Sequence, residues 1–334
     1  MEAVLYEKLS ENRVQCNICN HFCKIDNGEK GVCAVRKNRG GVLETLVYPK
    51  VIARGIDPVE KKPLYHVLPG STSYSIATVG CNLQCSFCQN ADIAQMPRSS
   101  GMITGADINP EDIVFQAIRA NCKSIAYTYT EPTVYFEFAF DTAQIAHENN
   151  LINIFVTNGF MSHKVIEKIA PFLTAANVDL KAFNDKFYQK YCKARLEPVK
   201  ENLKTMKALG IIIEVTTLLI PGLNDGREEL EALALFIKDE LGPQIPWHIS
   251  RFHPCHQMTD RSTTPLETLK AAYEIGKRAG LYNVYAGNAP ELGLENTFCH
   301  PCGAMLVQRT GYNTDSNIKD GKCPNCESKV YGIF

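Results

Sequence analysis

Residues 73–88 read SYSIATVGCNLQCSFC and join a strand-like apolar run to three cysteines spaced C-x3-C-x2-C. Cysteine thiolates are the usual ligands of iron–sulfur clusters, and a [4Fe–4S] cluster has four irons to ligate. Cys81, Cys85 and Cys88 supply only three thiolates, so one iron of such a cluster stays open to another molecule. The loop therefore predicts a catalytic cluster rather than a purely structural one.

Two further interpretations of this triplet stay open from the spacing alone. They are a zinc site completed by a distant histidine, and three ordinary thiols. Closely spaced cysteines outside an oxidising compartment usually indicate metal binding or catalysis. Zinc knuckles favour repeated C-x2-C pairs rather than a single triplet of unequal spacing. The remainder of the chain favours the cluster.

The overall composition is that of a globular protein. The chain has 334 residues, 35 Lys and Arg, 36 Asp and Glu, and a net charge of −1. This length predicts one large domain with attachments, or two domains. No basic stripe or acidic tract is present, so we expect no nucleic-acid partner. Residues 1–15 do not resemble a signal peptide and no apolar stretch approaches 18 residues, so we expect a cytoplasmic protein without a membrane partner.

A regular alternation of strand and helix patterns begins at residue 73. Strand-like apolar runs occur at 73–80, 124–131, 152–158, 176–182, 211–220, 246–252 and 283–288. Helix-period segments lie between them at 110–121, 133–149, 162–173, 197–209, 225–241 and 265–279. Repeated strand–helix units predict parallel strands with right-handed crossovers. Six or seven units, rather than eight, predict an α/β fold of the partial (β/α)6 TIM-barrel type over residues 73–289.

A small N-terminal segment, residues 1–72, precedes this barrel and is rich in cysteine. Four of its residues are closely spaced: Cys16, Cys19, Cys23 and Cys33. Four such thiols can close one metal site in a segment too small for a core of its own. Zinc and a second iron–sulfur cluster both stay open as the metal, because soft thiolate ligands suit either. Redox-active thiols and plain structural cysteines are also compatible with this spacing.

The rest of that segment, residues 41–72, has no clear chemical signal. A weak alternation predicts a strand near residues 42–47, and four prolines predict an irregular loop after it. Glu60-Lys61-Lys62-Pro63 within the loop is expected to be solvated and has no assigned role.

The C-terminal residues 290–334 leave the barrel pattern and carry four more cysteines. Cys299-x2-Cys302 and Cys323-x2-Cys326 are separated by 20 residues. This paired-knuckle spacing predicts one tetrahedral zinc held by four thiolates, as in a zinc ribbon. Such a zinc is structural because all four positions are filled by protein. The stretch between the pairs is not basic enough to predict nucleic-acid binding.

Polar residues follow the predicted strands, at the end where parallel barrels place their ligand sites. They are Glu131, Asn158, Asp179, Lys181 and His253. Each has an ordinary structural explanation: Glu131 or Asp179 as a helix cap, Asn158 in a turn, and His253 as a loop histidine. Their occurrence at one end of the sheet, together with the cysteine loop, favours a shared ligand.

Several of these motifs resemble those of radical S-adenosylmethionine (SAM) enzymes. They are the cysteine loop with Phe87 before its last cysteine, Thr130-Glu131-Pro132, Thr157-Asn158-Gly159, Asp179-Leu180-Lys181 and Phe252-His253-Pro254. They are most similar to the branch of glycyl-radical-enzyme activases, such as pyruvate formate-lyase activating enzymes. With the N-terminal cysteines, Trp247–Pro254 and the C-terminal knuckles, nearly the whole chain resembles the radical SAM member of the AmmeMemoRadiSam system. That system is named for its association with AMMECR-type and Memo-like proteins.

The resemblance implies a radical SAM barrel with a [4Fe–4S] cluster on Cys81, Cys85 and Cys88. SAM would occupy the free iron, and Phe87 would lie beside its adenine. An electron from a flavodoxin- or ferredoxin-type donor would cleave SAM to methionine and a 5′-deoxyadenosyl radical. This radical would abstract hydrogen from a substrate that the sequence does not identify. The cofactors carry this chemistry, and the protein orients them and excludes water.

The resemblance also implies which residues contact SAM. Glu131 would contact the amino group, and Asn158, Asp179 and Lys181 would hold the methionine or ribose part. His253 would lie near the adenosine.

One position departs from the family pattern. In the family the position two residues after this histidine is often acidic, whereas this chain has Cys255 there. A thiol near a radical site could serve as a reactant, but an idle loop cysteine is the favoured interpretation.

Three classes of function follow from these patterns. The first is a radical SAM enzyme acting on a small molecule or a partner-associated substrate. The second is an activase that forms a glycyl radical on a partner protein; it ranks lower because activases commonly carry a ferredoxin-type insert between the first strands. The third is a metal-stabilised binding protein without turnover.

Overall fold

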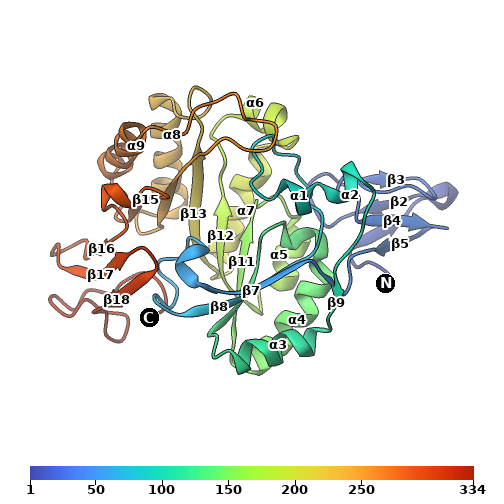
Figure 1. Ribbon diagram of the computed structural model, residues 1–334, viewed down its shortest axis with the longest axis horizontal. Helices are drawn as coiled ribbons and strands as arrows, with labels where there is room; N and C mark the ends of the chain where they lie inside the picture. The colour runs from blue at the N-terminus through green and yellow to red at the C-terminus, as the bar shows by residue number, and fades with distance from the viewer.

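The computed structural model describes residues 1–334, and an open eight-stranded sheet forms its centre (Figure 1). The strand order is β15-β14-β13-β12-β11-β10-β8-β7. The strands are β7 (Ala53–Pro58), β8 (Thr72–Ala77), β10 (Ser124–Tyr127), β11 (Ile152–Thr157), β12 (Leu173–Asp179), β13 (Ile212–Leu219), β14 (Trp247–Arg251) and β15 (Val284–Gly287). Strands β8 and β10 to β15 pair in parallel, and each occupies a predicted strand region. The predicted parallel α/β architecture is confirmed, and the sheet is open because β15 and β7 are its two edges.

Strand β7 is the one member of this sheet that the sequence pattern does not reveal. It pairs antiparallel with β8, from Ala53 opposite Ala77 to Pro58 opposite Thr72. Its sequence ARGIDP has no apolar alternation, and Pro58 stands at its end. An edge strand tolerates both features, because only one of its sides must donate hydrogen bonds to a neighbour.

The helices between the parallel strands follow the predicted segments closely. They are α3 (Pro110–Arg119), α4 (Phe136–Glu148), α5 (His163–Ile169), α7 (Glu197–Ala208), α8 (Arg227–Phe236) and α9 (Leu266–Ala279). Each is amphipathic and buries its apolar stripe; α4, for example, buries Phe136, Phe138 and Ala139. None of the helices combines the length and the apolar character that crossing a membrane requires.

Eight short helices lie in the connections between the strands or extend the longer helices. They are η2 (Val59–Lys61), α1 (Ala91–Ala94), α2 (Met96–Ser99), η3 (Pro132–Tyr135), α6 (Asp185–Phe187), η4 (Tyr188–Cys192), η5 (Ile237–Leu241) and η6 (Pro290–Leu292). Of these, η4 and η5 have π-helical hydrogen bonding and η2, η3 and η6 are 3-10 helices. π-helical turns are rare and often occur at functional sites.

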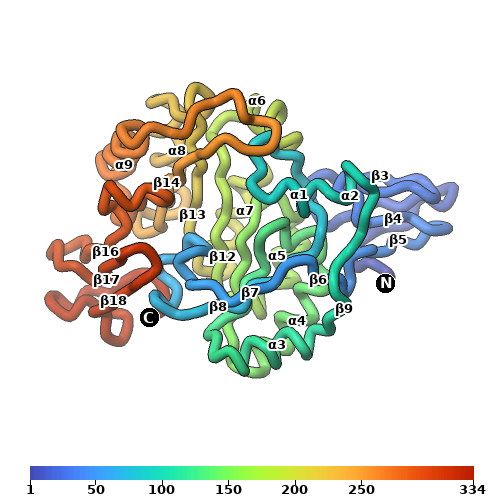
Figure 2. Tube along the Cα trace, viewed as in Figure 1, coloured from blue at the N-terminus to red at the C-terminus, as the bar shows by residue number.

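Two small β modules flank the sheet on opposite sides (Figure 2). The N-terminal one has a three-stranded sheet, β1 (Tyr6–Lys8), β2 (Val14–Cys16) and β3 (Lys24–Ile25), and a hairpin, β4 (Arg36–Arg39) and β5 (Val42–Thr45), with η1 (Ser10–Asn12) between β1 and β2. Strands β6 (Lys50–Val51) and β9 (Ala106–Asp107) pair at its border. The C-terminal module has the antiparallel strands β16 (Thr297–Phe298), β17 (Met305–Thr310) and β18 (Asn313–Ser316). Both modules therefore hold their cysteines in or beside short antiparallel strands.

Candidate active site

A cavity of about 650 Å³ lies at the carboxyl ends of the parallel strands. The cysteine loop that follows β8 forms one wall. Each of the other six parallel strands contributes at least one lining residue at or just beyond its end: Thr128, Asn158, Lys181, Leu218, Ser250 and Asn288. Ligand sites of parallel α/β folds lie at this end, because the loops there vary while the strands stay rigid.

The cysteine loop turns its thiols into this cavity, and Cys81, Cys85 and Cys88 all line it. The turn into the loop requires Gly80, whose φ is +100° and where a Cβ would lie 2.6 Å from Val35 Cγ1. Helix η4 holds the far side of the loop through backbone hydrogen bonds, including Gln84 N–H donating to the Cys192 carbonyl at 3.0 Å. The loop is therefore fixed by the N-terminal module on one side and by η4 on the other.

The environment of the thiols suits metal ligation. The Leu83 N–H and the Asn158 Nδ2–H donate to Cys81 Sγ at 3.4 and 3.6 Å, and such donors stabilise a thiolate. Burial raises the pKa of Cys88 to about 11 and the pKa of Cys81 well above its usual value. Free thiols here keep their protons at neutral pH, so the thiolate form depends on a bound metal. These residues fit a cysteine-ligated cluster.

Four of the residues predicted to contact SAM line the same cavity: Phe87, Asn158, Asp179 and Lys181. The Phe87 ring is buried, and Lys181 Nζ lies 5.9 Å from its centroid. Lys181 Nζ also lies 2.7 Å from Asp179 Oδ2. Burial opposes the charge on Lys181, but Asp179 and Cys85 raise the pKa of Lys181 well above its usual value. A fixed cation therefore stands between the cysteine loop and the end of β12.

Glu131 and His253 do not line the cavity. Glu131 is completely buried and caps η3 by accepting the Thr133 N–H at 3.1 Å. Its carboxylate also accepts the Thr157 Oγ1–H at 2.7 Å and the Asn158 N–H at 2.8 Å. His253 is exposed, and the one side-chain partner of its ring is Thr263, at 3.4 Å. Glu131 therefore caps a helix, which is the structural explanation that the sequence offered for it.

The structure corrects the expectation of a solvated loop at Glu60–Pro63. Glu60 and Lys62 are 5% and 2% exposed and line the cavity. Lys62 Nζ lies 2.6 Å from Asp57 Oδ2, and Asp57 belongs to β7. Pro58 at the end of β7 lies opposite Thr72, so η2 begins at the amino end of β8 and Lys62 reaches the cavity from that side, which a local charge pattern cannot predict. The spacing of Asp57 and Lys61, four residues apart, was the only signal in the sequence.

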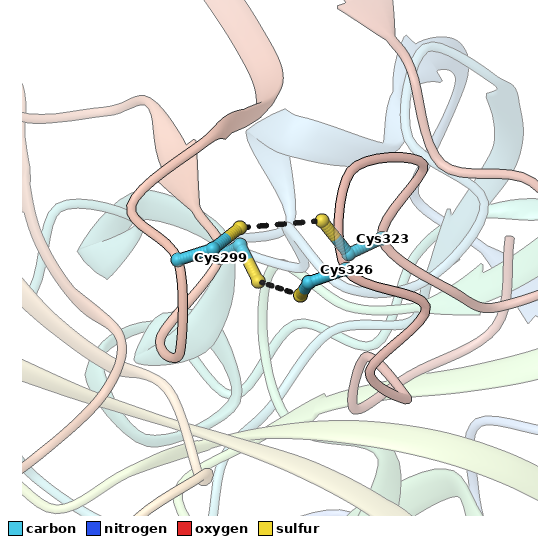
Figure 3. A group of neighbouring side chains, drawn as sticks. Cys299, Cys323 and Cys326 are labelled. Carbon is cyan, nitrogen blue, oxygen red and sulfur yellow. Dashed lines mark hydrogen bonds between the residues drawn. The ribbon is translucent and has the colours of Figure 1, made fainter.

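The predicted group of four cysteines in the C-terminal module is confirmed. The sulfur atoms of Cys299, Cys302, Cys323 and Cys326 all lie within 4.8 Å of one another. Figure 3 shows three of these side chains turned toward one another; the closest pairs are Cys299–Cys326 at 3.5 Å and Cys302–Cys323 at 3.7 Å. A tetrahedral zinc with Zn–S bonds of about 2.3 Å places its sulfurs about 3.8 Å apart. Gly311 and Tyr312 of this module also line the cavity that contains the cysteine loop.

The four N-terminal cysteines also come together in the fold. Cys16, Cys19, Cys23 and Cys33 line one small pocket, beside the cysteine loop. Cys255 belongs to none of the three groups, and its thiol donates to the Phe87 carbonyl of the cysteine loop at 3.3 Å. This contact makes Cys255 a support of the cysteine loop.

Comparisons with known proteins agree with this site. Residues 75–237 match the family model of the radical SAM superfamily. The chain is 45% identical to the protein MJ0808 of Methanocaldococcus jannaschii over 332 residues, which covers 98% of each. It is 22% identical over 179 residues to the pyruvate formate-lyase-activating enzyme of Clostridium pasteurianum, covering 51% of this chain and 72% of that enzyme. A radical SAM methyltransferase from Sphaerobacter thermophilus shares the fold with a TM-score of 0.53 at 19% identity, over 71% of each chain.

The family match covers most of β8, its cysteine loop and all of α8, so the three thiols that line the cavity lie within it. The family implies a [4Fe–4S] cluster and SAM. The chain belongs to the radical SAM superfamily, as an enzyme related to the glycyl-radical activating enzymes.

Proposed function

We propose that Cys81, Cys85 and Cys88 hold the cluster and that SAM binds in the cavity beside them, next to the substrate. The observation that carries this proposal is that all three thiols line one cavity together with Phe87 and Lys181. A cluster with three thiolate ligands keeps one iron free for the amino and carboxylate groups of SAM, and its one-electron chemistry supplies the radical.

The protein side chains orient these groups. Asn158 Nδ2 donates to Asn82 Oδ1 at 2.8 Å as well as to Cys81 Sγ, so it ties the end of β11 to the cysteine loop. Phe87 offers an apolar ring for the adenine, and the Asp179–Lys181 pair offers one acceptor and one cation for the methionine or ribose part of SAM. Glu131 acts through Asn158, whose backbone N–H it accepts.

The His253 loop supports the site indirectly. His253 is exposed and outside the cavity lining, but Cys255 on the same loop donates to the Phe87 carbonyl. We therefore assign His253 to the loop that encloses the adenosine end of the site rather than to a direct contact.

The lining away from the cysteine loop supports a polar substrate. It includes polar side chains within or just after four neighbouring strands: Asn177, Thr216, His248, Ser250 and Asn288. Lys62 and Tyr312 complete this side from η2 and the C-terminal module. Donors and acceptors at these positions fit a polar small molecule or a polar group presented by a partner protein.

Further assignments rest on the resemblance over the whole chain. We assign the chain to the AmmeMemoRadiSam system, with AMMECR-type and Memo-like proteins as partners and a flavodoxin- or ferredoxin-type electron donor. The features that support this assignment are the two cysteine modules, which lie on either side of the family match at residues 75–237. We assign zinc to the C-terminal four-cysteine group, because its sulfur separations fit a tetrahedral ion.

The test is anaerobic reconstitution with iron, sulfide, SAM and a reductant. We expect the parent chain to form 5′-deoxyadenosine and the Cys85→Ala variant to form none. Cys122→Ala removes a buried thiol outside all three cysteine groups and serves as the matched control, with parent-like product formation. A Cys85→Ala variant that forms 5′-deoxyadenosine at the parent rate would contradict the assignment.

The relationship to an activating enzyme favours one second candidate, a glycyl-radical activase. An EPR doublet of a glycyl radical on a co-purified partner would select it over small-molecule turnover.

A further inference from the structure

A second cysteine pocket shares a wall with the active site. Cys16, Cys19, Cys23 and Cys33 line it together with Arg36 and Asn82. Asn82 directly follows the cluster ligand Cys81, and its Oδ1 accepts a hydrogen bond from Asn158. The pocket is therefore one residue away from the catalytic cysteines.

Two buried N–H donors at this pocket have no partner in the protein. Arg36 and Asn82 are each 1% exposed, yet Arg36 Nε and Asn82 Nδ2 make no hydrogen bond. The other two nitrogens of Arg36 are occupied, since they donate to the Glu137 carboxylate at 2.8 and 2.6 Å. An unpaired buried donor costs about 1–3 kcal/mol. Two such donors lining one pocket indicate an acceptor that the protein itself does not supply.

The separation of the sulfur atoms distinguishes a cluster from a single zinc. The four C-terminal sulfurs lie within 4.8 Å of one another, whereas no three of the N-terminal sulfurs do. The catalytic triplet likewise fails this criterion, although the family places a [4Fe–4S] cluster there. A cluster with an iron at each of four corners spreads its thiolates more widely than one tetrahedral ion does. By this measure the N-terminal group resembles the cluster loop and differs from the zinc group.

The pocket is built on rigid neighbours. Cys19 pairs with Met161 as a β-bridge, and the Asn20 N–H donates to the Phe160 carbonyl at 3.1 Å. These contacts dock the N-terminal module on the loop after β11. Within the module, the Cys16 N–H donates to the Cys23 carbonyl at 2.9 Å. The four thiols are therefore held in place by tertiary contacts to the same strand end that supports the active site.

We propose that Cys16, Cys19, Cys23 and Cys33 bind a second [4Fe–4S] cluster, with Arg36 Nε and Asn82 Nδ2 donating hydrogen bonds to its sulfur atoms. All four irons then have a protein ligand, so this cluster has no open iron for SAM, and it supplies only one-electron storage or transfer. Sulfur atoms of such clusters accept hydrogen bonds from nearby donors, and these bonds tune the reduction potential. The site has its own pocket, and the comparison of sulfur separations rests on the cluster proposed for Cys81, Cys85 and Cys88.

Metal analysis of the anaerobically reconstituted full chain tests the site. We expect about eight irons and eight sulfides per chain in the parent and in Cys122→Ala, since two cubes are present. Cys16→Ala/Cys19→Ala and Cys81→Ala/Cys85→Ala should each keep about four of each. In the reduced state, the EPR signal of the first variant should change when SAM is added, and the signal of the second should not.

Mössbauer spectroscopy of the unmutated protein avoids any folding defect of these variants. All iron should appear as four-iron clusters, and SAM should alter the site of about one iron in eight rather than one in four. The proposal of a second cluster would be overturned if the parent holds about four irons and Cys81→Ala/Cys85→Ala loses them. It would also be overturned if that variant retains zinc at the N-terminal site. If the parent holds about four irons and only Cys16→Ala/Cys19→Ala loses them, the result supports a cluster at the N-terminal site and counts against one at Cys81, Cys85 and Cys88.

Discussion

Asp57 shows at the scale of single residues how a charged group is buried on the edge strand β7. Its carboxylate accepts hydrogen bonds from Lys61 at 2.7 Å, from Lys62 at 2.6 Å and from Ser75 Oγ at 2.7 Å. Tyr129 adds a fourth hydrogen bond. Burial disfavours the charge, but these donors hold the pKa of Asp57 well below its usual range. A buried ion pair is tolerated when further hydrogen bonds satisfy its charges, as the donors around Asp57 do for this carboxylate.

We expect Asp57→Asn to lower the free energy of unfolding by about 3 kcal/mol at pH 7, because Lys62 is left buried beside a neutral partner. The folded pKa of Asp57 lies below its unfolded value of about 3.9. Its contribution is therefore complete above that pH and is lost as the pH falls through the folded pKa. Urea unfolding should give the same difference in free energy of unfolding between parent and variant at pH 7 and pH 5. The difference should be smaller at pH 3.

Asp107→Asn is the matched control for this prediction. Asp107 forms an exposed pair with Lys50, and such pairs contribute little, so the change should stay below about 1 kcal/mol. If Asp57→Asn lowers the free energy of unfolding as little as Asp107→Asn does, the stabilising role of the buried Asp57–Lys62 pair is contradicted.

At the scale of elements, Glu131 joins the ends of two neighbouring parallel strands. It follows β10, caps η3 and accepts hydrogen bonds from Thr157 and Asn158 at the end of β11. Pro132 begins η3, where a missing N–H is harmless. The same contact fixes Asn158, which donates to Cys81. One buried carboxylate thus sets the spacing between two strand ends and the cysteine loop.

We expect Glu131→Ala to destabilise the protein by about 3 kcal/mol, because buried donors on Thr133, Thr157 and Asn158 lose their acceptor. Glu131→Gln keeps one acceptor oxygen and should recover part of this loss. Thermal unfolding should rank the parent above Glu131→Gln and Glu131→Ala last. Exposed Glu148→Ala is the control and should match the parent.

A positioning role predicts a second readout for the same variants. The cluster retained after desalting, measured as bound iron, should follow the same order, because Asn158 no longer has a fixed orientation toward Cys81. Full iron content in Glu131→Ala would show that Glu131 only caps η3.

At the scale of the whole molecule, the cavity depends on parts that are far apart in the sequence. The parallel strands supply residues at their ends, the segment after η2 supplies Lys62, and the C-terminal module supplies Tyr312. Arg309 anchors that module, since its buried guanidinium donates to the Tyr65 carbonyl at 2.7 Å and the Glu295 carbonyl at 2.9 Å. The four-cysteine group lies in the same module, and none of its cysteines lines the cavity.

We expect Cys323→Ala to lower the bound zinc by about one ion per chain and to lower the melting temperature, because a structural zinc contributes directly to folding. Iron and sulfide content should stay at the parent value, since the iron-binding cysteines lie elsewhere. Zinc analysis with calorimetry checks both statements. Cys122→Ala should keep its zinc, and unchanged zinc in Cys323→Ala would reject the zinc assignment.

The sequence by itself determined the features that depend on local spacing. The C-x3-C-x2-C loop, the paired C-x2-C knuckles and the alternating strand and helix patterns are short-range, so they predict the cluster loop, the four-cysteine group and the parallel sheet. Apolar periodicity also places all six predicted helices, because each helix buries one stripe against the sheet.

Only the tertiary structure decided the features that depend on contacts between distant segments. The edge strand β7 has no periodic pattern, and the burial of Lys62 follows from where β7 lies. The position of Glu131 behind the cavity rather than in it follows from the geometry of η3 and β11. The N-terminal cysteines are near Asn82 because their module docks on the loop after β11. The physical reason is common to all of these: burial and hydrogen-bond partners come from long-range packing, which residue spacing along the chain does not encode.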